Sequence, residues 1–198
     1  MNIGPYSLED YMHLVKSFHG SVAPGLIVGG FMVEAAKGEL PPGILYDAIT
    51  ETVVCLPDAV QLLTPCTVGN GWLRVLDLGR FALCLYDKTT GRGVRVFVDP
   101  GKLDGRPAVR DWFLRLKAKR DQDPVRLRDE IIAAGTDILG VRPVVVARSF
   151  IAGGRKKGPI TLCPACGEAY PAADGPRCLA CDGNYGDIII CDLVRKRE

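Results

Sequence analysis

The sequence predicts an α+β protein with a small metal-binding domain at its C-terminal end, and three observations carry this prediction. Apolar residues recur at helical spacing near the N-terminus and again over residues 107–139. Between these helical regions, residues 44–98 hold short apolar runs separated by turn residues, a pattern typical of strands in a sheet. Four cysteines near the C-terminal end form two Cys-x2-Cys pairs, a spacing typical of a metal site.

Two helices are expected at the N-terminal end. Ser7, followed three residues later by Asp10, has the pattern of a capping box, which predicts a helix that ends near His19. A second helix follows, with Pro24 in its first turn and an apolar body that closes at Gly38.

A strand, a short helix and three further strands are expected next. Ile44–Cys55 has a partly alternating apolar pattern, and we expect Asp58 to act as the N-cap of a short helix that ends at Leu63. The three strands are expected to pair in chain order as a meander. They are Trp72–Asp77, Phe81–Tyr86 and Val94–Val98.

The first domain is expected to finish with two amphipathic helices, Pro107–Lys119 and Pro124–Leu139, and a strand over Val144–Ile151. The glycine-rich, basic segment that follows is typical of a domain boundary. The predicted organisation is a domain over residues 1–152, with a helical extension at about 105–140, a linker over 153–158, and a metal-binding domain over 159–198.

The C-terminal cysteines form the most specific motif of the chain. Cys163 and Cys166 make one pair, Cys178 and Cys181 the other, and each pair can present two thiolates to one tetrahedral ion. About 40 residues are too few for a useful hydrophobic core, so the ion would supply most of the folding energy. We expect structural Zn²⁺, although iron in a rubredoxin-like site uses the same ligands. Cys191, in a predicted strand over Ile188–Val194, is expected to be a small buried residue.

No membrane segment or export signal is expected. The longest uncharged stretches, Gly20–Val33 and Ala59–Leu73, are 14 and 15 residues long, and a membrane-spanning helix needs roughly 18–20. Glu9 and Asp10 stand where a signal peptide would be apolar. We therefore expect a cytoplasmic protein, in which paired cysteines bind metal more often than they form disulfides.

Charge is distributed unevenly, although the formal net charge is only +2. Residues 101–158 carry 14 basic and 7 acidic side chains, which suits an anion, a nucleic-acid backbone or an acidic partner. A solvated helical face is the simpler interpretation, and we favour it. The tail is net acidic and has only Tyr170 and Tyr185 as aromatic residues, so a protein partner is favoured over nucleic acid.

Three residues of the first domain are candidates for a second metal site. His19 ends the first helix, and Cys55 and Cys66 flank the short helix, so all three lie where helix ends can meet. The alternatives are a histidine that interacts with the helix dipole and cysteines that are simply buried. Asp58 or Gln61 could orient a ligand or accept a proton, and for Asp58 we favour the N-cap.

Residues 7–100 contain an ordered set of short motifs. They are Phe18-His19-Gly20, Pro24-Gly25-Leu26, Cys55 with Asp58-Ala59 and Gln61, Cys66-Thr67, and Gly69-Asn70-Gly71 with Leu73. This combination resembles the FmdE-like family of formylmethanofuran dehydrogenase proteins, some members of which also end in a cysteine zinc finger. The resemblance implies a domain of helix, strand, helix and three further strands with a mixed sheet, followed by a treble-clef-like zinc domain.

The same resemblance implies that His19, Cys55 and Cys66 gather in a pocket that binds a second Zn²⁺ or another divalent metal. The chain departs from the family pattern at Ser21 and Ala23, where a second His and a nearby Cys are usual. Gly30-Phe31 also stands where a basic residue is common. These differences remove two metal ligands and one positive charge.

The function implied by the resemblance is that of a metal-binding accessory or regulatory protein in molybdenum- or tungsten-dependent one-carbon metabolism. Its partners would be subunits of a formylmethanofuran dehydrogenase-type enzyme. One alternative is a zinc-finger module that binds protein or nucleic acid, and another is a small zinc-dependent hydrolase or lyase that uses His19 and Cys55. A homodimer is also expected, since the helical stripe with Trp112 and Phe113 can pack on a second copy or on the first domain.

Overall fold

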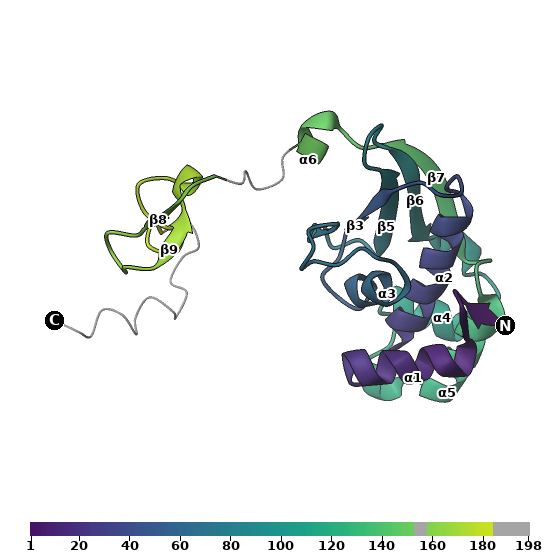
Figure 1. Cartoon of the computed structure of the whole chain (residues 1–198). Helices are drawn as coiled ribbons and strands as arrows, with labels where there is room; N and C mark the ends of the chain where they lie inside the picture. Colours follow the sequence, from purple (N-terminus) through teal and green to yellow (C-terminus); the bar gives the residue numbers. More distant parts are fainter. Residues whose placement is uncertain (153–157, 184–198) are drawn as a thin grey trace. The chain divides into compact units, whose positions relative to one another are not determined.

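The chain forms two compact units, Met1–Ile151 and Ala152–Glu198, in a computed structural model (Figure 1). The structure describes residues 1–152 and 158–183. The predicted linker over 153–158, apart from Gly158, and the predicted strand Ile188–Val194 with Cys191 lie outside the described residues.

Helix α1 (Leu8–His19) begins where its sequence pattern places it. It follows a small antiparallel pair, β1 (Asn2–Ile3) and β2 (Tyr6–Ser7). The Ser7 hydroxyl oxygen accepts a hydrogen bond from the Asp10 backbone N–H at 3.1 Å, and the hydroxyl donates to the Asp10 carboxylate at 2.6 Å. The helix ends at Gly20, which has a φ of 86° and donates its N–H to the Lys16 carbonyl.

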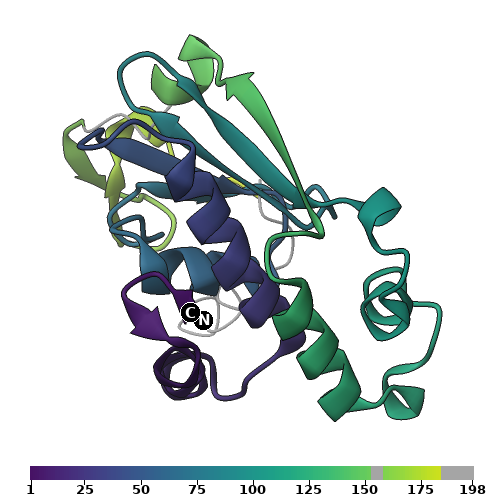
Figure 2. The same cartoon turned by 90° about the vertical axis from the view of Figure 1, so that its right-hand side faces the viewer.

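Helix α2 (Pro24–Gly38) is the central helix of the first unit and lies across one face of the sheet (Figure 2). Its glycines allow close packing on both sides. A Cβ on Gly29 would lie 2.8 Å from the Cβ of Ala59, and one on Gly30 would lie 2.9 Å from Tyr11. The low helix propensity of glycine is therefore offset by the close approach of neighbouring helices.

The sheet of the first unit is mixed and has the strand order β4-β3-β5-β6-β7. The predicted meander is wrong at its first strand, because β4 pairs in parallel with β3 and not with β5. Helix α3 (Leu56–Leu63) connects β3 to β4, and such a crossover is what parallel pairing requires. The strands are β3 (Tyr46–Thr50), β4 (Leu73–Val75), β5 (Ala82–Asp87), β6 (Arg92–Val98) and β7 (Leu139–Val145).

Two predicted strands have different bounds in the structure. The strand expected over Ile44–Cys55 stops at Thr50, because the chain turns there toward α3. The last predicted strand, Val144–Ile151, overlaps β7 by only two residues, and its end forms the short helix α6 (Arg148–Ala152). Runs of Val and Ile fit both states in this region, so local composition does not decide between them.

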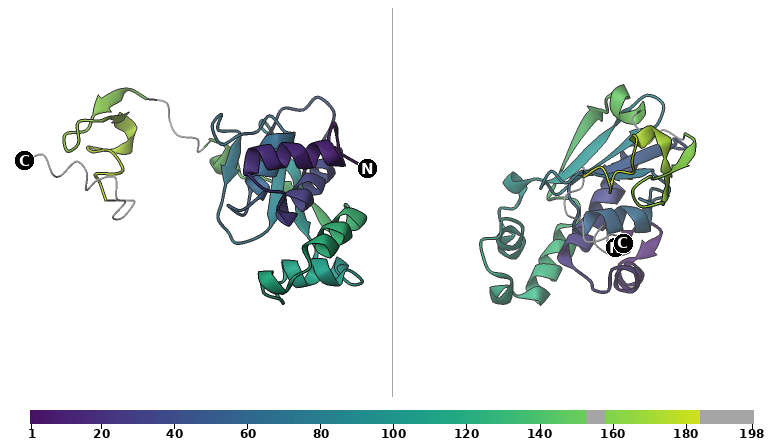
Figure 3. Two further views of the ribbon diagram at one scale, coloured as in Figure 1. Left: turned by 90° about the horizontal axis from the view of Figure 1, so that it is seen from below. Right: turned by 90° about the vertical axis from the view of Figure 1, so that its left-hand side faces the viewer.

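The predicted helical extension contains α4 (Pro107–Phe113) and α5 (Pro124–Ala134), with short 3-10 turns η1 (Pro100–Lys102) and η2 (Lys119–Asp121). Both helices end earlier than expected. The left view of Figure 3 shows them side by side at one edge of the first unit. The described side chains of Trp112 and Phe113 pack against the core of their own unit. None of the helices in the described part of the chain has the length and apolar character needed to cross a bilayer.

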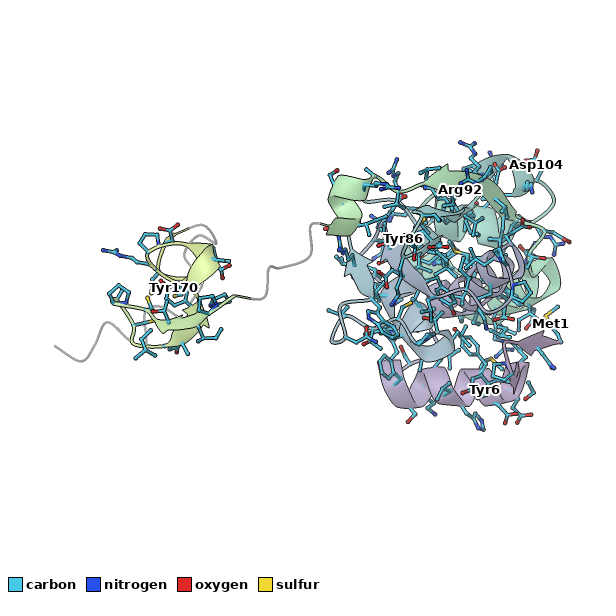
Figure 4. The ribbon with its side chains drawn as sticks, turned by 45° about the horizontal axis from the view of Figure 1, so that its top comes forward. Met1, Tyr6, Tyr86, Arg92, Asp104 and Tyr170 are labelled. Atoms are coloured by element: carbon cyan, nitrogen blue, oxygen red, sulfur yellow. The ribbon has the colours of Figure 1, made fainter. Side chains whose placement is uncertain are left out.

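The second unit is built on a short antiparallel pair, β8 (Ile160–Leu162) and β9 (Ala169–Pro171), followed by the 3-10 turn η3 (Ala172–Asp174). Tyr170 lies inside this unit (Figure 4), and its hydroxyl donates to the Gly175 carbonyl at 2.9 Å. Few other apolar side chains are buried here, so the small unit depends on another source of stability.

Candidate metal centres

The four tail cysteines converge on one point. Ligand atoms of Cys163, Cys166, Cys178 and Cys181 all lie within 4.8 Å of one another. The sulfurs of Cys166 and Cys178, one from each pair, are 3.8 Å apart. Among the described residues, no other group of three or more His, Cys, Asp or Glu side chains gathers its ligand atoms in this way.

Each cysteine pair lies on a tight turn closed by backbone hydrogen bonds. In the first turn, the Gly167 N–H donates to the Cys163 carbonyl at 2.8 Å, with Gly167 at a φ of 77°. In the second, the N–H groups of Cys181 and Asp182 both donate to the Cys178 carbonyl at 3.0 Å. Gly183, with a φ of 75°, then turns the chain away. The two turns thus aim four thiols at one centre.

The chemistry of this donor set fits a closed zinc site. Backbone N–H groups, that of Cys178 above all, lower the pKa of Cys163 to about 6, which favours the thiolate that a metal needs. Four thiolate sulfurs satisfy the tetrahedral preference of Zn²⁺ and leave no open position for a substrate. The ion that these residues would hold is therefore structural rather than catalytic.

Cys55 stands at an unusual point of the first unit, between β3 and α3. Its φ and ψ are 57° and −50°, and the Leu56 N–H donates to the Val54 carbonyl at 2.6 Å, which makes a γ-turn of the rare, strained kind. Its side chain packs against Gly25 in the first turn of α2. Burial raises the pKa of the Cys55 thiol, and the nearby Asp58 carboxylate raises it further.

The Asp58 carboxylate binds His19 rather than the start of its own helix. Asp58 Oδ2 lies 2.7 Å from His19 Nδ1, and both side chains are about 30% exposed. The expected N-cap role is wrong, because α3 begins two residues earlier than predicted and Cys55 occupies the N-cap position. This placement leaves Asp58 in the first turn, where a carboxylate interacts favourably with the helix dipole.

Cys66 is not part of this arrangement. It follows the other end of α3, and eight helical residues span about 12 Å. Its sulfur is buried and donates a hydrogen bond to the Tyr46 carbonyl at 3.5 Å. Gln61 faces the same end of the helix, where its side-chain oxygen accepts from the Val68 N–H. The structure brings His19, Asp58 and Cys55 to one region and leaves Cys66 outside it.

Two residues that shape the neighbourhood of Cys66 have no signal in the sequence. Lys88 lies 3.0 Å from the Asp47 carboxylate, and its ammonium group is 3.3 Å from the centre of the Trp72 ring. These residues come from a strand and two loops, so only the folded sheet places them together. Gly25, which fits against Cys55, could have been found only from the close approach that the fold imposes.

Comparisons with known proteins agree with this geometry. Residues 18–146 match the family described as "FmdE, Molybdenum formylmethanofuran dehydrogenase operon". The chain belongs to the FmdE family. Residues 154–185 match the FmdE treble clef zinc finger, which contains the four tail cysteines.

A solved relative is similar to this FmdE protein along nearly its whole length. It is an FmdE-like protein of tungsten formylmethanofuran dehydrogenase from Syntrophus aciditrophicus, 54% identical, with a TM-score of 0.86. The match covers 94% of this chain and 98% of the relative. The α+β fold with a mixed sheet and a C-terminal treble-clef zinc domain is thereby confirmed.

A curated relative from Archaeoglobus fulgidus is named "Probable S-adenosyl-L-methionine-binding protein". It is 30% identical to this FmdE protein over 203 aligned residues, which cover 91% of the chain. The chain spans 54% of that relative's length.

Proposed function

We propose that this FmdE-family protein is an accessory protein that holds one structural zinc ion and acts by binding another protein. The observation that carries the proposal is the convergence of the four tail sulfurs in a unit with little other core. A closed site of this kind orders a small binding domain and supplies no open position for catalysis. The zinc-bearing unit would then be a recognition element.

The partner that we propose is an enzyme of the molybdenum or tungsten formylmethanofuran dehydrogenase type, in the cytoplasm. The family description and the name of the solved relative support this choice. The described residues contain no further cysteine cluster that would hold an iron–sulfur centre, so the redox chemistry would belong to the partner.

The proposal assigns one zinc ion to each chain, and elemental analysis tests it. Cys163→Ser should remove the ion, whereas Cys55→Ser should leave the zinc content unchanged. Cys84→Ser is the matched control, because Cys84 is buried in the sheet away from both regions. A second ion that Cys55→Ser removes would contradict the assignment and support the pocket metal expected from the sequence. It would also favour the small hydrolase or lyase.

Co-purification tests the partner. Tagged wild-type protein in an anaerobic extract should retain a large molybdenum or tungsten enzyme, and Cys163→Ser should retain much less of it. Retention that does not depend on the zinc unit would contradict the recognition role. Affinity for nucleic acid that falls steeply with salt would instead favour the zinc-finger nucleic-acid module.

A further inference from the structure

The sheet of the first unit has a second apolar cluster, separate from the main core. Helices α2 and α3 cover one face of the sheet. On the opposite face, Ile49, Cys84 and Tyr86 form a small cluster of buried residues. The segment after β7 covers them with partly buried apolar side chains, including Phe150 and Ile151 of α6. Figure 4 shows Tyr86 on the side of the first unit where α6 lies.

Helix α6 has five residues, too few to be stable without tertiary contacts. Arg74 of β4 supplies several of these contacts. Its guanidinium group donates to the carbonyl of Phe150, and to that of Ile151 at 3.3 Å. It also lies 4.5 Å from the centre of the Phe150 ring. A single arginine therefore binds the last turn of α6 by charged hydrogen bonds and by a cation–π contact.

A glycine fits the segment closely at its other end. The Val146 N–H donates to the Gly91 carbonyl at 2.8 Å. A Cβ on Gly91 would lie 2.5 Å from the Val146 carbonyl oxygen and 3.0 Å from the Ile151 side chain. The β5–β6 turn thus leaves room for the segment that leads into α6.

What α6 covers is less well satisfied than the main core. Tyr86 is fully buried, and its hydroxyl has no hydrogen-bond partner among the described residues. Cys84 is 6% exposed, and burial, with a further contribution from Glu51, raises its pKa to about 12. An unpaired hydroxyl is costly to bury, and water would satisfy it if the cover were removed. Local opening at this cluster therefore costs less than opening of the main core.

We infer that α6 is a strap, fastened by Arg74, which opens over Ile49, Cys84 and Tyr86 while the rest of the first unit stays folded. The strap is the last element of this unit, and the chain continues from it into the zinc unit. Any change in the zinc unit that pulls on the chain acts on α6 before it acts on the core. When the strap opens, the Arg74 guanidinium and the Tyr86 hydroxyl become accessible to solvent.

The test is the rate at which N-ethylmaleimide labels individual cysteines in the folded, zinc-loaded full-length protein, measured by peptide mass spectrometry at fixed pH. Arg74→Gln should increase the labelling rate of Cys84 by about tenfold or more, because it removes hydrogen bonds from a charged donor. The rate at Cys66, which is buried in the main core, should stay unchanged. Arg128→Gln, which alters an exposed arginine of α5 paired with Asp129, should leave both rates as in wild type.

An unchanged rate at Cys84 in Arg74→Gln would overturn the strap. Equal acceleration at Cys84 and Cys66 would overturn it as well, since that result means opening of the whole unit. If Arg74→Gln fails to fold, Phe150→Ala provides the same comparison, because it removes the ring that covers the cluster and leaves Arg74 in place. It should also accelerate labelling of Cys84 relative to Cys66.

Discussion

His19 Nδ1 lies 2.7 Å from Asp58 Oδ2, and this pair ties the end of α1 to the first turn of α3. It stands beside the strained turn at Cys55 and fixes which ring nitrogen of His19 faces the carboxylate. The geometry makes Asp58 a link between two helices.

Removal of this link should lower stability by a modest amount. Asp58→Ala is expected to reduce the free energy of unfolding by about 1 kcal/mol, the usual net value of one partly exposed hydrogen bond. Urea unfolding of the two single variants and the double variant with His19→Ala should give a coupling energy of about 0.5–1.5 kcal/mol. Asp104→Ala, at an exposed position of the same unit, is the control. A coupling energy of zero would contradict the link.

The fit between α2 and Cys55 predicts opposite effects for two glycine substitutions in one helix. A Cβ at Gly25 would lie 3.0 Å from the Cβ and 3.1 Å from the sulfur of Cys55. Because the tight turn restricts Cys55, Gly25→Ala should destabilise the protein by about 1–3 kcal/mol. Gly38→Ala, where nothing lies within 4 Å, should instead stabilise it by about 0.5–1 kcal/mol. Thermal unfolding measures both, and equal effects would refute the packing argument.

Glu51 should make stability depend on acid pH. Its carboxylate accepts two hydrogen bonds from Arg95, at 2.6 and 2.7 Å, and pairs with Arg80 at 2.7 Å. Hydrogen bonds from Arg95 are the main cause that lowers the pKa of Glu51. A lowered folded-state pKa gives stability that is present above the unfolded pKa and is lost as pH falls through the folded one.

The variant Glu51→Gln should therefore be less stable by about 2 kcal/mol at neutral pH, since it loses hydrogen bonds to a charged group. The difference from wild type should shrink as the pH falls below the usual range of a glutamate. Urea midpoints at several pH values give this comparison. A difference that stays constant down to strongly acidic pH would show that the carboxylate charge is not the cause.

Arg115 offers a stabilising substitution. It has a φ of 54° and occupies the position after the C-cap of α4, where the Leu116 N–H donates to the Asp111 carbonyl at 2.9 Å. Glycine is the residue that this motif favours. Arg115→Gly should stabilise the protein by about 1 kcal/mol, and Arg115→Ala, which keeps the Cβ, should give no such gain. A stability loss in Arg115→Gly, measured by thermal unfolding, would contradict the assignment of strain.

Local patterns were sufficient where one short segment determines its own structure. Ser7 predicts the start of α1 because its hydroxyl caps the helix that follows directly. The spacing of the tail cysteines predicts a single metal centre because each pair lies on one turn. In both cases the residues that interact are close in sequence.

Patterns failed where the partner lies far away in sequence. The pairing of β4 with β3 depends on the crossover by α3, and nothing within Leu73–Val75 specifies it. Asp58 has the residue type of an N-cap, yet its partner is His19, 39 residues earlier. Cys66 joined the predicted ligands by residue type alone, and the length of α3 separates it from Cys55.

The zinc centre is tested most directly by X-ray absorption at the zinc edge of the purified full-length protein. Four sulfur neighbours at about 2.3 Å, with one zinc ion per chain, are the predicted result. A first shell with nitrogen or oxygen ligands, or with fewer than four sulfurs, would contradict a centre made of Cys163, Cys166, Cys178 and Cys181.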